Sequence, residues 1–243
     1  MTLIWRPGKV TLAKEFTWNE TVWNPSMLQT DLWFDAADAS TIIESGGDVS
    51  QWNDKSGNGD NAIWSGSKPT YELGAFNGKD SIYFDGTDFL RISGFNLDLS
   101  PFTIMFVGEG KLESAGVNNV PRLYFNNNNI SYVNNNITAS WAEDETKRLL
   151  SWSFDGIDSH TVHRNASSTA TATQAATSGL VNDYGIGRAG GLYSDGRFCE
   201  YIVLRRNATT TERQKLEGYL AHKWGLTANL PSGHPYKLVG PTP

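Results

Sequence analysis

The chain has 243 residues, 39% of them hydrophobic and 12% aromatic, and this composition excludes an intrinsically disordered protein. The formal net charge of −6 argues against nucleic-acid binding, because proteins that bind phosphate backbones cluster Lys and Arg on one surface. No apolar stretch approaches the ~20 residues that span a bilayer, so we expect no membrane partner either.

Residues 1–28 differ from the rest of the chain in their widely spaced aromatic side chains and two prolines. We interpret them as an N-terminal arm and residues 29–243 as the domain. Either the arm packs on the domain, or its aromatic side chains anchor the domain to a partner, since such side chains are enriched in interface cores. The predicted partner-docking residues are Trp5, Phe16, Trp18 and Trp23.

Short apolar runs separated by Gly, Asn, Asp and Ser begin at Leu32, and this rhythm is typical of antiparallel strands joined by turns. Residues 102–107 predict a strand buried on at least one face, because apolar side chains occur on both faces. Residues 150–154 alternate apolar side chains with serines and predict a half-buried strand. The single cysteine, Cys199, lies in an apolar run and is expected to pack in the core.

Four consecutive asparagines separate the strand-like segments 122–125 and 130–133. Because Asn tolerates the left-handed backbone conformation of tight turns, these segments predict a hairpin. The low-complexity stretch 166–178 is rich in Ser, Thr and Ala, and it is either an edge strand or a loose loop.

A helix is predicted over residues 209–225. Thr209 and Glu212 have the spacing of a capping box, and Gly225 supplies the stop signal. The helix has one apolar stripe, so we expect it to lie on a sheet or across the mouth of a sandwich. That stripe consists of Leu216, Tyr219, Leu220 and Trp224.

Six motifs follow one another between about residues 30 and 230. They are Leu-Trp-Phe-Asp-Ala at 32–36, Trp-Asn-Asp-Lys-Ser-Gly-Asn-Gly at 52–59, Ile-Tyr-Phe-Asp-Gly-Thr-Asp-Phe-Leu at 82–90, the strands 102–107 and 149–156, and the strand-helix pair within 200–226. In this order they resemble the laminin G-like, concanavalin A-like jelly-roll domains seen in phage virion and bacterial surface proteins. The resemblance implies an all-β fold, a two-sheet antiparallel β-sandwich (jelly roll) with the N-terminal arm and one short C-terminal helix.

The resemblance implies less about function, because this architecture hosts lectins, lyases, hydrolases and display modules. A chain with an arm, a jelly roll and no apolar signal segment at its start is similar to phage decoration, fibre or adhesin proteins. We therefore expect a non-enzymatic structural or adhesion module, made in the host cytoplasm and displayed on the virion surface. Its expected partners are other virion or surface-assembly proteins through the arm, host glycans, and further copies of the chain in a homo-oligomer.

The sequence lacks the catalytic residue sets known from this architecture. Glucanases of the laminarinase type need carboxylates alternating along one strand, and no such strand is present. Lyases need a His and a Tyr beside a uronate, and the paired candidates, His160 and His163, point to opposite faces of one strand. We expect both to be surface or edge histidines. The alternatives to a non-enzymatic structural or adhesion module are a polysaccharide-degrading enzyme (hydrolase or lyase) with a diverged site and a stand-alone lectin.

Oxygen-bearing side chains occupy alternate positions in residues 54–60, as at the opening of a calcium loop. The twelfth position is Ser65 where a bidentate Glu would stand, which excludes a helix-loop-helix calcium site. Either a looser calcium site is present, or Ser-Gly-Asn-Gly is turn chemistry. Calcium is the only cofactor expected, and its candidate ligands are Asp54, Ser56, Asn58 and Asp60.

Sugar recognition needs aromatic faces for stacking and amide or carboxylate groups that hydrogen-bond hydroxyls. The Asn-rich hairpin region and the loop 190–195 have this composition. The candidate glycan-binding residues are Tyr124, Asn127, Tyr132, Asn135, Trp141, Tyr193 and Asp195.

Overall fold

The computed structural model describes residues 23–97, 101–116, 122–126, 129–132, 135–138, 146–173, 183–189 and 191–243. Within these ranges the chain is mostly β-structure with one α-helix, and that helix is too short and too polar to cross a membrane. The strands are β1 (Leu32–Asp35), β2 (Ile42–Ser45), β3 (Asp48–Trp52), β4 (Ala62–Trp64), β5 (Thr70–Phe76), β6 (Lys79–Asp85), β7 (Leu90–Ser93), β8 (Phe102–Gly116), β9 (Arg122–Asn126), β10 (Asn129–Tyr132), β11 (Asn135–Thr138), β12 (Arg148–Phe154), β13 (Ser159–Arg164), β14 (Ser167–Thr173), β15 (Asp183–Ile186), β16 (Arg188–Ala189), β17 (Leu192–Tyr193) and β18 (Asp195–Leu204); the helix is α1 (Thr210–Lys223), and 3₁₀ turns span Pro25–Leu28, Ala39–Thr41 and Thr227–Asn229.

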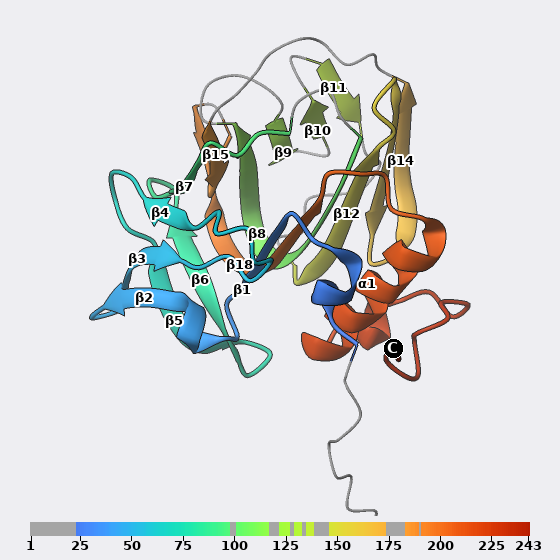
Figure 1. The fold of residues 1–243 in the computed structure, drawn as a ribbon, viewed down its shortest axis with the longest axis horizontal. Helices are drawn as coiled ribbons and strands as arrows, with labels where there is room; N and C mark the ends of the chain where they lie inside the picture. Colours follow the sequence, from blue (N-terminus) through green and yellow to red (C-terminus); the bar gives the residue numbers. More distant parts are fainter. Residues whose placement is uncertain are drawn as a thin grey trace, which may run out of the picture.

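All but β16 and β17 of these strands join one antiparallel sheet, which folds over on itself into the two layers of a β-sandwich (Figure 1). The two long strands β8 and β18 pair along most of their length and cross between the layers. Residues 195–198 of β18 pair with β6 and residues 200–203 pair with β1, with a register shift in between. Likewise, β8 pairs first with β12 and then with β9. The predicted all-β sandwich is confirmed, although its two layers belong to one continuous sheet.

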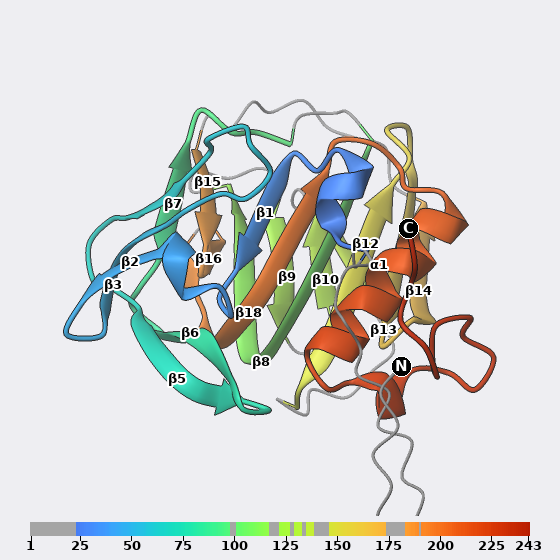
Figure 2. The same cartoon turned by 60° about the horizontal axis from the view of Figure 1, so that its bottom comes forward.

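We call one layer the helix layer, because α1 covers its outer side (Figure 2). It contains β1, β12, β13, β14 and the adjoining halves of β8 and β18. The facing layer, which we call the open layer, contains β6, β5, β3, β4, β7 and β15. The candidate site described below lies on the open layer.

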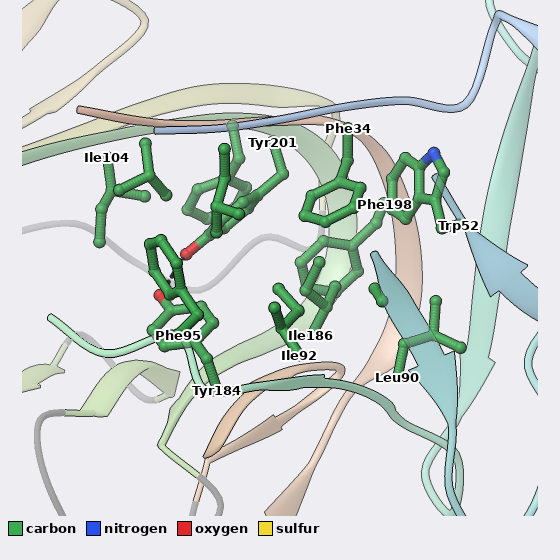
Figure 3. Packing of buried hydrophobic residues seen from close by; sticks show 14 of the residues in the cluster. Phe34, Trp52, Leu90, Ile92, Phe95, Ile104, Tyr184, Ile186, Phe198 and Tyr201 are labelled. Carbon is green, nitrogen blue, oxygen red and sulfur yellow. Dashed lines mark hydrogen bonds between the residues drawn. The ribbon is translucent and has the colours of Figure 1, made fainter. Parts of the chain in front are cut away.

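The main core lies between the two layers. Because side chains alternate along each strand, every second one points inward, and these inward residues are mostly aromatic or branched. Figure 3 shows Tyr184 and Tyr201 pointing toward one another among them, with their hydroxyl oxygens 2.5 Å apart. One hydroxyl therefore donates to the other, so neither buried oxygen is without a hydrogen-bond partner.

A second hydrophobic cluster lies between the helix layer and α1. Trp23 belongs to it, is only 2% exposed and packs edge-to-face on Tyr219, with ring centroids 5.9 Å apart. The described end of the arm thus packs on the domain itself, which was one of the two interpretations of the arm. The other predicted docking residues, Trp5, Phe16 and Trp18, lie outside the described residues.

A buried carboxylate, Glu200, joins α1 to the sheet beside this cluster. Its Oε1 accepts hydrogen bonds from the indole nitrogen of Trp33 (2.8 Å) and the hydroxyl of Tyr219 (3.1 Å). Its Oε2 accepts from the indole nitrogen of Trp224 (2.7 Å) and pairs with the ammonium of Lys223 (2.7 Å). Burial raises the pKa of this carboxyl, and the Lys223 charge acts in the opposite direction. Each oxygen thus has two donors, which is the satisfied state that a buried charge requires.

The helix begins and ends as predicted. The Thr209 hydroxyl accepts a hydrogen bond from the Glu212 amide (3.3 Å), and the Glu212 carboxylate accepts one from the Thr209 amide (2.9 Å), so the capping box is confirmed. Gly225, beyond the last turn, has a φ of 69°, the left-handed conformation that ends helices. On the predicted stripe, Leu216, Leu220 and Trp224 are completely buried.

The structure corrects two predictions about β12 and β13. The outer face of β12 is not solvated, because α1 covers it and Ser151 is buried. The prediction that His160 is a surface or edge residue is wrong, because β14 pairs beyond β13 and the ring is fully buried, stacked 4.4 Å from the ring of Phe154. His163 is part-buried on the other side of β13, where burial and the charge of Arg213 lower its pKa to about 4.

Other local predictions are confirmed. The hairpin forms between β9 and β10, with Phe125 opposite Ile130. The low-complexity stretch supplies the edge strand β14, and Cys199 is buried in the second cluster.

Candidate functional site

Polar and aromatic side chains line the outer side of the open layer where β5, β6, β18 and β8 run side by side. Ile82 and Phe84 of β6 point into the core, so Tyr83 between them points outward. In the strand register Tyr83 lies opposite Arg197 of β18, and Arg197 lies opposite Glu109 of β8. The sheet itself therefore fixes the positions of these side chains.

Arg197 and Asp195 hold the ring of Tyr83 from two directions. The Tyr83 hydroxyl donates a hydrogen bond of 2.9 Å to Asp195, and this bond, with burial, raises the pKa of the hydroxyl. The guanidinium carbon of Arg197 lies 5.3 Å from the Tyr83 ring centroid. Arg197 in turn pairs with Glu72 (2.6 Å) and Glu109 (2.8 Å). Two ion pairs thus fix the cation that lies on the ring.

A second aromatic group adjoins the first through the start of β18. The rings of Phe89 and Tyr193 pack edge-to-face with centroids 6.2 Å apart, and the guanidinium of Arg188 lies 4.9 Å from the first and 5.1 Å from the second. Ser194 is completely buried, so its neighbours Tyr193 and Asp195 both point away from the core. Asp195 therefore lies between the two aromatic groups.

We call this region the Tyr83–Tyr193 surface. Tyr83 and Tyr193 are part-exposed rings with apolar faces, Phe89 is buried against Tyr193, and the exposed Asp195 accepts hydrogen bonds from hydroxyl groups. Every residue of this surface except Phe89 lies on a paired strand, so the arrangement is pre-formed. The surface consists of Glu72, Tyr83, Phe89, Glu109, Arg188, Tyr193, Asp195 and Arg197.

The structure brings together two of the seven predicted glycan-binding residues, Tyr193 and Asp195, and adds partners that sequence reasoning missed. The sequence does contain a pattern that places Tyr83 on the outer face, because it stands between two apolar residues of the strand β6. Every strand of a sandwich has such outward positions, however, so the pattern does not single out a site. The structure does not describe the side chains of the remaining predicted residues. Three lie in the strands β9, β10 and β11, where only the backbone is described: Tyr124, Tyr132 and Asn135. Asn127 and Trp141 lie outside the described residues.

The predicted calcium loop, residues 54–60, is fixed by hydrogen bonds within the chain. Asp54 Oδ1 accepts from the amides of Trp33 and Ser56 (both 2.9 Å), and Oδ2 accepts from the Ser56 hydroxyl (2.5 Å). The side-chain amide of Asn58 donates to the backbone carbonyl of Asp31 (2.9 Å). Burial, with the charges of Asp54 and Asp31, raises the pKa of Asp60. These are the contacts of the turn-chemistry interpretation.

The oxygens of Asp54 in that loop already accept N–H and O–H groups, so a metal ion bound there would compete with these contacts. In the described part of the chain, no group of three or more His, Cys, Asp or Glu side chains is arranged to hold a metal ion. Calcium at Asp54, Ser56, Asn58 and Asp60 stays a prediction.

Neither a protein-family model nor the sequence of a curated protein matches the chain. Solved structures match it in fold. Domain 4 of AbnA, a GH43 extracellular arabinanase from Geobacillus stearothermophilus, in complex with arabinotriose, aligns with a TM-score of 0.57 and 11% identity over 77% of this chain and 98% of that domain. An arabinofuranosidase complexed with arabinofuranosyl-α-1,2-xylobiose aligns with a TM-score of 0.60 and 10% identity, over 80% of this chain and 59% of that one.

A further match is the binding domain of botulinum neurotoxin DC in complex with SialylT, with a TM-score of 0.54 and 8% identity over 79% of this chain and 51% of that one. This chain thus spans only about half to three fifths of the arabinofuranosidase and neurotoxin chains. At such identities the likeness shows a shared β-sandwich fold and no more.

Proposed function

We propose that this protein is a non-enzymatic glycan-binding module and that the Tyr83–Tyr193 surface is its binding site. The observation that carries the proposal is the fixed ring of Tyr83, with Arg197 on one face and Asp195 on its hydroxyl. A sugar stacks its C–H groups on the other face, while its hydroxyls hydrogen-bond to the exposed carboxylate of Asp195. Structures of similar fold in complex with arabinotriose or SialylT support the proposal.

Binding rather than hydrolysis is the activity we infer for this surface. A glycosidase needs one carboxyl as acid and a second as base or nucleophile on opposite sides of the scissile bond. On this surface Glu72 and Glu109 both pair with Arg197, so their oxygens face a guanidinium and not a substrate. Some structures of similar fold belong to glycoside hydrolases, so the enzyme alternative is tested as well. A reducing-sugar assay and an unsaturated-uronate assay on a panel of polysaccharides detect hydrolase and lyase activity.

The biological setting belongs to the same proposal. The resemblance to laminin G-like jelly rolls supports a virion surface protein of the decoration, fibre or adhesin type, docked through the arm. Mass spectrometry of purified particles tests it, and a protein found free in the host cytoplasm and absent from particles would contradict it.

Deletion of residues 1–22 tests the role of the arm without removing Trp23 from the sandwich. Loss of assembly with unchanged thermal stability of the domain supports docking by Trp5, Phe16 and Trp18.

A glycan array tests binding directly. We expect the wild-type chain to give reproducible hits that Tyr83→Ala abolishes and that Ile157→Ala leaves unchanged. Ile157 is the matched control because it is 72% exposed, in the turn between β12 and β13, and belongs to neither aromatic group. Tyr83→Phe keeps the ring but not the bond to Asp195, so it should weaken binding less than Tyr83→Ala.

A further inference from the structure

We infer that the Tyr83–Tyr193 surface selects a neutral oligosaccharide over one bearing a sialic or uronic acid, an inference that rests on the proposed function. The structures of similar fold include one solved with arabinotriose, which is neutral, and one solved with SialylT, so the fold leaves the ligand class open. The charges and spacing of this chain's own side chains decide between the two classes.

Arg197, the cation on the Tyr83 ring, is already neutralised by its neighbours. A cation that recognises an acidic sugar must offer its N–H groups to the ligand's carboxylate. Arg197 instead donates from Nε to Glu72 (2.6 Å) and from Nη1 to Glu109 (2.8 Å). One guanidinium thus faces two carboxylates, so the cluster of Arg197, Glu72 and Glu109 is already net negative without a ligand.

Asp195 adds to that charge at the point where a sugar would bind. It is exposed, lies between the two aromatic groups, and accepts the hydrogen bond of the Tyr83 hydroxyl. Its neighbours across the strands are Asp85 on β6 and Lys111 on β8. Counting these with the eight surface residues gives four carboxylates (Glu72, Asp85, Glu109, Asp195) against three cations (Arg188, Arg197, Lys111), a net charge of −1. An acidic sugar over Tyr83 is therefore repelled, whereas neutral hydroxyls find acceptors.

The spacing of the two aromatic groups favours a ligand of several sugars. Arg197, beside Tyr83, is four residues along the chain from Tyr193, and four residues span at most ~14 Å. The two aromatic groups are thus neighbours on one surface, within reach of one short oligosaccharide. In the binding mode that we infer, one sugar ring stacks on Tyr83 and a further ring of the same glycan reaches Tyr193. Affinity should therefore rise with the length of the glycan.

The experiment uses the full chain on an array of neutral, sialylated and uronate-bearing glycans, followed by calorimetric titration of matched pairs. Lactose with 3′-sialyllactose varies the charge, and arabinose with arabinotriose varies the length. We expect neutral glycans to bind about tenfold or more tightly than their acidic counterparts. Asp195→Asn, which keeps the acceptor for Tyr83 but removes a charge, should narrow that difference, while Ile157→Ala should not.

The outcomes separate this inference from the proposed function. Binding that needs Tyr83 but favours acidic glycans overturns the inference and leaves the proposed function standing. Equal affinity for arabinose and arabinotriose, when either binds, overturns the length argument. Glycan binding that survives both Tyr83→Ala and Tyr193→Ala, or no binding to any glycan on the array, overturns both.

Discussion

The indole nitrogen of Trp224, at the end of α1, donates a hydrogen bond of 2.7 Å to Glu200 in the middle of the helix layer. Because Glu200 is completely buried and also pairs with Lys223, its charge is tolerated only while these donors surround it. Glu200→Ala leaves two buried indole donors and the Tyr219 hydroxyl without their acceptor, and it removes one of the two carboxylates that pair with Lys223. We expect it to lower the free energy of unfolding by about 3–5 kcal/mol in urea denaturation.

Glu44→Ala is the control for that prediction, since Glu44 is an exposed glutamate whose carboxylate accepts a hydrogen bond from the Gly47 amide (2.7 Å). It should cost about 1 kcal/mol or less. Equal effects of the two substitutions would show that the buried network contributes little to holding α1 on the sheet.

The capping box of α1 predicts a pH-dependent contribution to stability. Hydrogen bonds from Arg206 and Thr209, partly offset by burial, lower the pKa of Glu212 from 4.5 to about 2. A lowered carboxyl pKa means that the stabilisation is complete above the unfolded-state value and is lost as pH falls from 4.5 toward 2. Glu212→Gln should therefore cost about 1 kcal/mol at neutral pH and progressively less below pH 4.5. Chemical denaturation at several pH values measures this, and a cost that stays constant down to pH 3 (about one unit above the folded pKa) would contradict it.

His163 predicts a second pH effect, at higher pH. Its pKa falls from 6.5 to about 4 on folding, so the unfolded chain takes up a proton between these values that the folded chain does not. Stability is therefore lost as pH falls from 6.5 to 4. In His163→Gln this loss should be smaller by roughly 1–2 kcal/mol. Thermal or urea unfolding of both proteins across that range tests it; parallel pH profiles would refute the assignment.

Much of this fold is predictable from the sequence because the deciding interactions are local. The capping box needs only Thr209 and Glu212, three residues apart, and the hairpin of β9 and β10 needs only its asparagines. The prediction that His160 is a surface or edge residue is wrong for a non-local reason. Whether a strand lies at the edge of a sheet depends on which other strand pairs beside it. Here that neighbour is the Ser/Thr/Ala stretch of β14, whose sequence also suits a loop.

The candidate site was predictable only in part, for a similar reason. Tyr193 and Asp195 stand in one loop-like segment with a suggestive composition, so they could be found. Tyr83 and Arg197 are more than a hundred residues apart, and they meet only because β6 and β18 pair in one register. Composition cannot show such a pairing, and an outward tyrosine on a strand has no distinct local pattern.

The loop at residues 54–60 predicts the outcome of metal addition and removal. Because both oxygens of Asp54 already accept hydrogen bonds from Trp33 and Ser56, we expect the thermal midpoint to be the same in calcium and in a chelator. A midpoint that rises with calcium, and no longer does so in Asp60→Asn, would establish the site that the sequence suggested. Asp54 is unsuitable for that test, since replacing it also breaks the turn.

The most direct measurement is a crystal structure of the chain with the best glycan from the array. The account predicts a sugar ring stacked within about 4 Å of Tyr83, on the face opposite Arg197, with hydroxyls hydrogen-bonded to Asp195. A glycan bound instead at the hairpin of β9 and β10, with Tyr83 and Tyr193 free, would contradict it.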